Sequence, residues 1–161
     1  MIKQFIDIRS RAKLFTGLSF TISGLMLGYT LLNLLVLEDI IPWKAAVFQQ
    51  EPILASKYVL LLLPGCSLLI CVLLYLDSRR SKLPPLFRLG EPDSPARLAI
   101  YRQGSIGVNF IAALLAAFCT LDQLNTAKQL PGFGWFVPLL CLIALILFAG
   151  FQLRRLAAVS E

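Results

Sequence analysis

Histidine is absent from this sequence, so the chain lacks the side chain that most often serves as a general base or as a metal ligand. Charge is scarce as well: 15% of the 161 residues are charged, whereas ordinary soluble domains are about 25% charged. The charged residues flank the long apolar stretches, and none lies inside one. Proton and ion relays through a membrane normally need an ionisable group at that depth. We therefore expect no catalytic residue, no metal and no cofactor, and a protein that is not an enzyme.

The four cysteines all fall inside apolar stretches, and no two of them form a CxxC motif. Cys66 and Cys71 are five positions apart, so on a helix they point to different faces. We interpret them as buried thiols that behave as small hydrophobic side chains. Cys119 and Cys141 would approach each other near the outer ends of their helices, and the sequence leaves open whether they form a disulfide.

The hydrophobic residues, 58% of the chain, are concentrated in four stretches: residues 14–37, 58–76, 103–121 and 135–153. A helix needs about 20 predominantly apolar residues to cross the hydrocarbon core of a bilayer, and each stretch has about that length. The short connections leave no room for a second domain. The sequence therefore predicts an all-α, polytopic membrane protein, with residues 1–161 forming a single bundle of four transmembrane helices.

Lysine and arginine are distributed unevenly between these stretches. Residues 1–13 carry four, the loop 77–102 carries six and the tail carries two, while the two remaining loops share three. Positive charge marks the cytoplasmic side of membrane proteins, so we expect both termini in the cytoplasm and the protein in the cell inner membrane. The net charge of +6 lies beside the apolar stretches, which indicates contact with membrane lipids and not with nucleic acid.

Small residues follow one side of the first stretch. A helix turns by about 100° per residue, so four of these residues fall within a strip of the helix surface about 60° wide. They are Gly17, Thr21, Gly24 and Gly28. Gly24 and Gly28 form a GxxxG pair, which lets the backbone of another helix come close. The third stretch is also rich in small residues, with Ala112 and Ala116 among them, and we expect it to pack on at least one neighbour, or two.

Asn33, Asn109 and Pro64 are unusual residues inside the stretches. The side-chain amides of Asn33 and Asn109 need hydrogen-bond partners in lipid, so we expect both residues to face the bundle. We expect them to make structural contacts between helices in preference to contacts with a substrate. Pro64, followed by Gly65, predicts a kink near residues 60–64, because proline removes a backbone hydrogen bond and clashes with the preceding turn. Such a kink serves either as a hinge or as a packing feature.

The segments outside the stretches carry weaker signals. Residues 1–13 are interpreted as a basic leader that fixes orientation, with a short amphipathic helix on the membrane surface as the alternative. Pro42 is placed to begin a brief helix that ends near Pro52. Residues 122–134 are expected to form a short outer turn, because Pro131 is followed by Gly132 and Gly134, which break a helix.

The basic loop 77–102 carries two further predictions. Pro95 after Ser94 is typical of a helix start, and this helix either continues into the third stretch or bends near Gly104 and Gly107. The basic residues are candidates for binding the phosphates of lipid headgroups, although clusters of this kind often only set the topology. The candidates are Arg79, Arg80, Lys82, Arg88 and Arg97.

Three functions are compatible with these features. The first is a non-enzymatic protein that associates through its helices with another membrane protein or with itself, as an accessory or assembly subunit or as an immunity protein against a membrane-inserting toxin. The second is a small oligomeric transporter or channel, in which Asn33, Asn109 and the kink at Pro64 line a polar cavity. The third is a lipid-modifying enzyme, for which the sequence offers no nucleophile with an evident base. The small residues favour the first.

Overall fold

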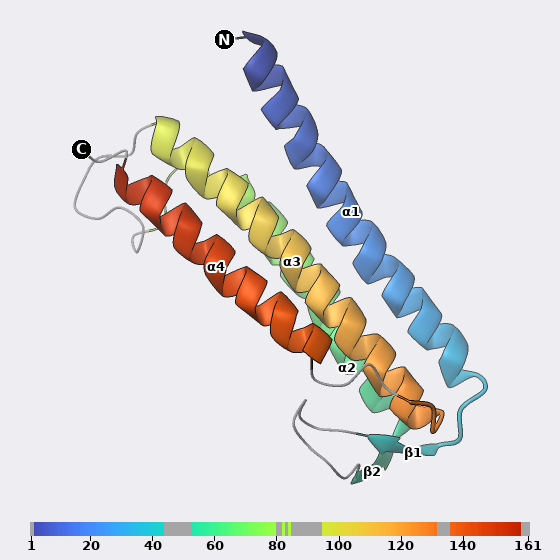
Figure 1. Ribbon diagram of the computed structural model, residues 1–161. Helices are drawn as coiled ribbons and strands as arrows, with labels where there is room; N and C mark the ends of the chain where they lie inside the picture. Colours follow the sequence, from blue (N-terminus) through green and yellow to red (C-terminus); the bar gives the residue numbers. More distant parts are fainter. Residues whose placement is uncertain are drawn as a thin grey trace.

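The computed structural model describes residues 2–43, 53–79, 82, 84, 95–131 and 136–158, with side chains from Lys13 onward except that of Pro138. Four α-helices make up most of it: α1 (Ile2–Leu34), α2 (Leu62–Ser78), α3 (Pro95–Ala127) and α4 (Phe136–Ala158). Between α1 and α2 lie the strands β1 (Ile40–Trp43) and β2 (Ile53–Ser56) and the 3-10 helix η1 (Lys57–Leu61). The start of α1 and the end of α4 lie at one end of the molecule, which we call the terminal end (Figure 1). The strands lie at the opposite end, which we call the hairpin end.

The structure contains four helical stretches that are long and apolar enough to cross a membrane, which confirms this part of the prediction: Lys13–Leu34, Lys57–Ser78, Pro95–Ala127 and Leu139–Ala158. The chain thus has the architecture of a helical multi-pass membrane protein. Of the two possible paths after Pro95, the chain takes the straight one, since α3 passes through Gly104 and Gly107 as one continuous helix.

The end of α3 lies further along the chain than expected. The helix continues to Ala127, so the turn predicted over residues 122–134 begins later. Gln129 adopts a left-handed backbone with φ of 56°. The amide of Leu130 donates to the Asn125 carbonyl at 2.8 Å, and that of Gln129 to the Thr126 carbonyl at 3.0 Å, which is a Schellman motif. Gln129, the left-handed residue, and Pro131 end the helix. The polar residues between the apolar stretch and Ala127 are still part of the helix.

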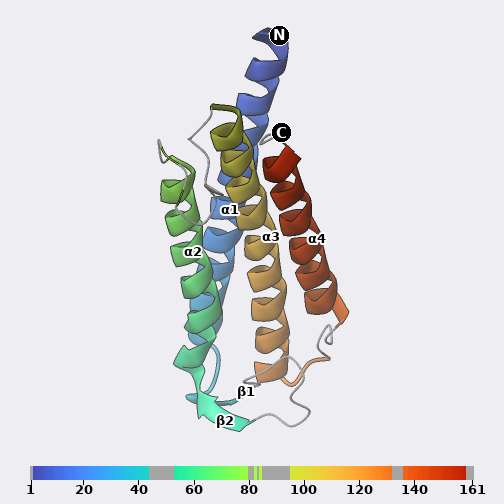
Figure 2. The ribbon, with the colours of Figure 1, turned by 90° about the vertical axis from the view of Figure 1, so that its left-hand side faces the viewer.

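The basic leader prolongs the first transmembrane helix. α1 is one helix from Ile2 to Leu34, and its first residues extend the helix axis beyond the ends of α3 and α4 (Figure 2). A helix lying flat on the membrane surface would need a break between the leader and the apolar stretch, and this backbone has none. The structure therefore disfavours the amphipathic surface helix.

The segment after α1 is a β-hairpin, so the prediction of a helix beginning at Pro42 is wrong. β1 pairs antiparallel with β2 in the register Ile41 to Ala55 and Pro42 to Leu54. β-Branched residues favour strands, and a two-stranded ribbon has only edge strands, where proline is tolerated. The expected end of that helix near Pro52 lies outside the described residues. Lys57 closes the base of the hairpin, since its amide donates to the Asp39 carbonyl at 3.0 Å and its ammonium lies 3.0 Å from the Asp39 carboxylate.

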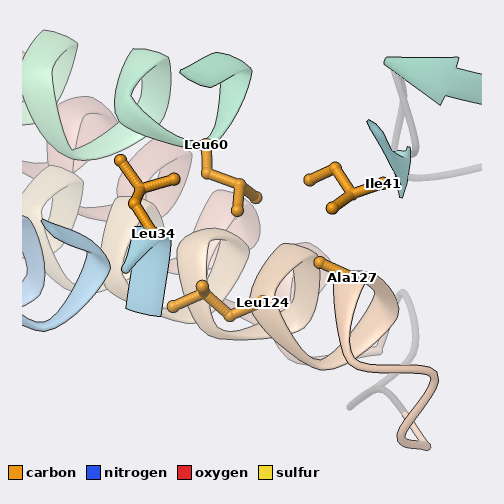
Figure 3. Close-up of a cluster of buried hydrophobic side chains, with 5 residues drawn as sticks. All are labelled: Leu34, Ile41, Leu60, Leu124 and Ala127. Atoms are coloured by element: carbon orange, nitrogen blue, oxygen red, sulfur yellow. The ribbon is translucent and has the colours of Figure 1, made fainter. Parts of the chain in front are cut away.

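The hairpin end contains a cluster of buried apolar side chains. Ile41 of β1 is 1% exposed, and it lies where the ends of α1, η1 and α3 meet (Figure 3). Its neighbours in the cluster are Leu34, Leu60, Leu124 and Ala127. The hairpin thus closes the bundle at this end by burying apolar surface, in the manner of a soluble core.

α3 is the central helix. The sequence predicted at least one neighbour, or two, and the described residues of α3 contact three helices. α3 packs against α1, α2 and α4, whereas α4 makes most of its contacts with α3. Phe15 of α1 meets Phe110 of α3 with ring centroids 5.2 Å apart. On the α4 side, Phe148 lies directly over Gly107: a Cβ atom built on this glycine would be 2.2 Å from the end of the ring. Only 6% of the apolar part of α4 is buried, against 28% for α3, so α4 has the largest surface left for lipid.

The second transmembrane segment changes helix type where the kink was expected. η1 is a 3-10 helix up to Leu61, and the α-helix starts at Leu62. Pro64 is the third residue of α2 and is buried. In the first turn of a helix the missing amide of proline costs little, because that amide would have no α-helical partner.

Gly107→Ala should loosen the contact between α3 and α4. The new methyl group needs the space that the Phe148 ring occupies, and overpacking of this kind typically costs about 1–3 kcal/mol. The free energy of unfolding in detergent should fall by that amount, and Phe148→Leu in the same chain should recover part of it. Gly150→Ala on α4 is the matched control, since nothing lies within 4 Å of a Cβ atom there. Equal stability of the two alanine variants would contradict the packing.

Candidate functional site

The small residues of the first helix form an exposed surface, the glycine face, which consists of Gly17, Thr21, Gly24 and Gly28. Nothing lies within 4 Å of a Cβ atom built on any of the three glycines. The side of α1 that packs against the bundle carries other residues, namely Ser19, Ser23, Thr30 and Asn33, all of them buried. At about 100° per residue the two sets lie on opposite sides of the helix. The described residues therefore leave the glycine face uncovered.

Ala112 and Ala116 lie on a different surface. They line a groove of about 250 Å³ between α2, α3 and α4, together with Ser67, Cys71 and Leu145. The small residues of α1 and the alanines of α3 were predicted as surfaces for a partner helix, and the structure places them on two separate surfaces. The alanines border an intramolecular groove, and the glycine face points away from the bundle.

Polar side chains join α1, α2 and α3 in what we call the polar contact, which consists of Ser23, Ser67, Cys71 and Asn109. The hydroxyl oxygens of Ser23 and Ser67 are 2.9 Å apart, and the Cys71 sulfur lies 3.4 Å from the Ser23 oxygen. The side-chain amide of Asn109 on α3 donates to the Cys71 carbonyl at 3.5 Å. All four residues are buried, so three helices meet at hydrogen-bonding groups in the apolar part of the protein.

Sequence reasoning did not identify these serines as a contact. The signal was a pair of small polar residues four positions apart in each helix, Ser19 with Ser23 and Ser67 with Cys71. Such a pair lies on one face of a helix and allows close approach to a second helix. Of the two thiols in α2 that were predicted to be buried, Cys71 is buried, but Cys66 is exposed, so the prediction is wrong for Cys66. Cys119 and Cys141 are free thiols.

Both predicted asparagines are buried. Asn109 is 2% exposed and belongs to the polar contact. Asn33 donates from its side-chain amide to the Tyr29 carbonyl one turn earlier at 2.7 Å, so its partner lies in its own helix. Neither residue borders the groove beside Ala112 or the larger cavity at the terminal end.

The basic candidates differ in their surroundings. Arg79 is exposed at the end of α2, where its guanidinium lies 4.7 Å from the centre of the Tyr75 ring, and Lys82 is also exposed. Arg97, in contrast, is 1% exposed and buried within the folded chain. Arg80 and Arg88 lie outside the described residues. Of the predicted headgroup ligands in the described part of the chain, Arg79 and Lys82 are the two that reach the surface.

The described residues hold no group of three or more acidic or cysteine side chains arranged to bind a metal ion. Asp77 accepts a hydrogen bond from the Tyr101 hydroxyl, which joins the end of α2 to the start of α3. Searches against protein-family models, curated proteins and solved structures found no match to this chain. The arrangement of its own residues is therefore the basis for a functional proposal.

Ser23→Ala and Ser67→Ala should be coupled in their effect on stability. Hydrogen bonds between transmembrane helices contribute about 0.6 kcal/mol on average and about 1.7 kcal/mol at most. A double-mutant cycle, measured by unfolding in mixed micelles, should therefore give a coupling energy of about 0.5–1.5 kcal/mol. Thr21→Ala replaces an exposed residue of the glycine face and should show no coupling to Ser67→Ala. Additive effects of the two serine substitutions would show that the hydroxyls do not interact.

Proposed function

We propose that this chain is a non-enzymatic protein of the cell inner membrane that works by associating with a helix of another membrane protein. The glycine face of α1 is the proposed docking surface. The protein would act as an accessory or assembly subunit, or as an immunity protein that binds a membrane-inserting toxin.

The observation that carries this proposal is the exposed position of the glycine face. Lipid tails are as apolar as leucine, so helices in a membrane gain little from burying apolar side chains. They associate through close backbone packing, for which a GxxxG pair provides space. Gly24 and Gly28 have that space open, while the packing of α1 on its own bundle uses the opposite side. A partner helix could therefore bind without displacing any intramolecular contact.

The proposed orientation rests on the distribution of charge over the two ends. Arg79 and Lys82 follow the end of α2, and Arg154 and Arg155 lie near the end of α4, all at the terminal end. Lys57 and Lys128 lie at the hairpin end. By the positive-inside rule the terminal end faces the cytoplasm, and both termini lie there. The hairpin would then face the outer side, where its apolar cluster is in contact with the membrane–water interface.

The transporter alternative receives no specific support. It requires a polar cavity that joins Asn33, Asn109 and Pro64, and these residues border neither of the two cavities described. We therefore keep the association hypothesis alone.

Gly24→Leu and Gly28→Leu should each remove most of the complex while leaving the chain folded. The larger side chain separates the helix backbones, but nothing inside the monomer occupies that space. Complexes extracted in mild detergent from the source cells should be sized on native gels. The wild type should migrate with a second membrane protein or a second copy, identified by mass spectrometry, and the variants as the single chain.

Gly150→Leu is the matched control, because Gly150 is another exposed glycine in an apolar helix with nothing within 4 Å of its Cβ position. It should retain the wild-type complex. A wild-type chain that migrates alone in native extracts, or a Gly150→Leu variant as defective as Gly24→Leu, would refute the proposed docking surface.

The orientation predicts which lysine is reachable from outside the cell. Lys128→Cys places a thiol at the exposed hairpin end, and Lys82→Cys places one at the exposed terminal end. A membrane-impermeant maleimide should label the first in intact cells and the second only after the membrane is opened, with the wild type giving the background of the native thiols. Labelling of Lys82→Cys in intact cells would show that the terminal end faces outward and would contradict the proposed orientation.

A further inference from the structure

Several large apolar side chains are exposed at the hairpin end and have no part in the proposed association. Two of them follow α1 directly, two lie on the strands and one lies in η1; we call this set the apolar rim. It consists of Leu35, Val36, Ile40, Leu54 and Tyr58. Val36 is 87% exposed and Leu54 is 77% exposed. Exposed apolar side chains that occur singly are ordinary, but several at one end of a molecule indicate a surface that contacts a partner.

The hairpin carries apolar side chains on both of its faces. Side chains alternate between the two faces along a strand, so Ile40 faces away from the buried cluster to which Ile41 belongs. In the register of the strands, Pro42 is paired with Leu54 and Ile40 is paired with Ser56. The outer face therefore carries three apolar side chains and one serine. A hairpin that presents its outer face to water normally has polar residues there, so this face is suited to a partly apolar environment.

Basic side chains beside tyrosine rings indicate the level of the hairpin in a bilayer. The ammonium of Lys57 lies 6.0 Å from the centre of the Tyr58 ring, and that of Lys128 lies 5.8 Å from a tyrosine ring of α1. Tyrosine rings and long basic side chains gather at the headgroup level of membranes. Tyr75 has the same kind of neighbour, Arg79, at the terminal end. From Tyr58 to Tyr75 the chain rises by about 26–28 Å, close to the roughly 30 Å of a hydrocarbon core, so the two tyrosines are placed at opposite headgroup layers.

The backbone of the hairpin favours the same level. In the described residues the sheet has two strands, so each strand has an open edge. Open sheet edges do not occur inside the hydrocarbon core, because nothing there satisfies their amides and carbonyls. In bulk water, open edges beside an apolar face favour aggregation. The headgroup layer provides water for the backbone and the upper part of the acyl chains for the side chains, so it meets both needs.

We propose that the apolar rim is inserted into the headgroup layer of the leaflet at the hairpin end, and that lipid is the partner that covers it. Leu35 and Val36 continue the exposed apolar side of α1 into this layer, and Ile40 and Leu54 enter it from the hairpin. The hairpin then anchors the bundle at a fixed depth and is not a platform for a soluble protein. This proposal rests on the four apolar helices, and it needs neither the partner helix at the glycine face nor a particular orientation.

The test measures the depth of a single tryptophan in the full-length protein. Trp43 and Trp135, the two native tryptophans, are replaced by phenylalanine, and Leu54→Trp or Ile40→Trp is introduced in that chain. Each variant is reconstituted in phosphatidylcholine vesicles whose lipid is brominated either near the glycerol end or near the methyl end of its chains. Bromine quenches the fluorescence of a tryptophan that it contacts. Both tryptophans should be quenched about twofold more by the lipid brominated near the glycerol end, because interfacial apolar groups reach only about 5–10 Å into the boundary between headgroups and chains.

Ile146→Trp in the same chain is the matched control, because Ile146 is an exposed apolar residue in the middle of α4. Its tryptophan should show the reverse preference, for the lipid brominated near the methyl end. Circular dichroism establishes that each variant retains its helices. Quenching of the two rim tryptophans by iodide in the buffer but by neither lipid would place the hairpin in water, open to a soluble partner, and would overturn the proposal. Resistance to both kinds of quencher, which indicates cover by protein, or the same depth preference as Ile146→Trp would overturn it as well.

Discussion

The rest of the fold depends on one interaction between α1 and α2. In it, Ser23 of α1 contacts both Ser67 and Cys71 of α2. A bilayer provides no hydrophobic force between helices, so α1 and α2 must be joined by close approach and hydrogen bonding. The hydroxyl oxygens are 2.9 Å apart, a distance that larger side chains at these positions would prevent. Asn109 then ties α3 to the same place through the Cys71 carbonyl, and α3 in turn supports α4.

The two parts of the molecule are stabilised by different forces. Away from the hairpin end, many of the buried side chains between α1, α2 and α3 are small and polar, such as Ser19, Ser67 and Thr120. At the hairpin end, Ile41 and Leu124 form an apolar cluster instead. This division follows the surroundings, because apolar burial is favourable only where the alternative is exposure to water. The hairpin closes the bundle where the apolar stretches end, and the serines join the helices within those stretches.

The helices were predictable from length and hydropathy because the bilayer fixes both. Local signals were less reliable. The strand at Pro42 was missed, since proline starts helices as readily as it occupies an edge strand, and only its pairing with Leu54 decides between them. Arg97 was grouped with surface arginines by charge alone, although it is buried. The glycine face was recognisable from the spacing of its residues. Its position opposite the polar contact was not, because that position depends on how three helices pack together, and no single stretch determines this packing.

The separation between the two sides of α1 has a consequence for how the protein can act. Because folding uses Ser23 and Thr30 while Gly24 and Gly28 stay open, substitutions on the glycine face should cost the fold little, and they can therefore test the proposed association separately from folding. α4 is the opposite case: it is attached chiefly through α3, at contacts such as Gly107 with Phe148, and leaves cavities toward α2. In the described part of the chain α4 is linked to α1 chiefly through α3, so a helix bound on the glycine face should leave the contact of Gly107 with Phe148 unchanged unless α3 itself moves.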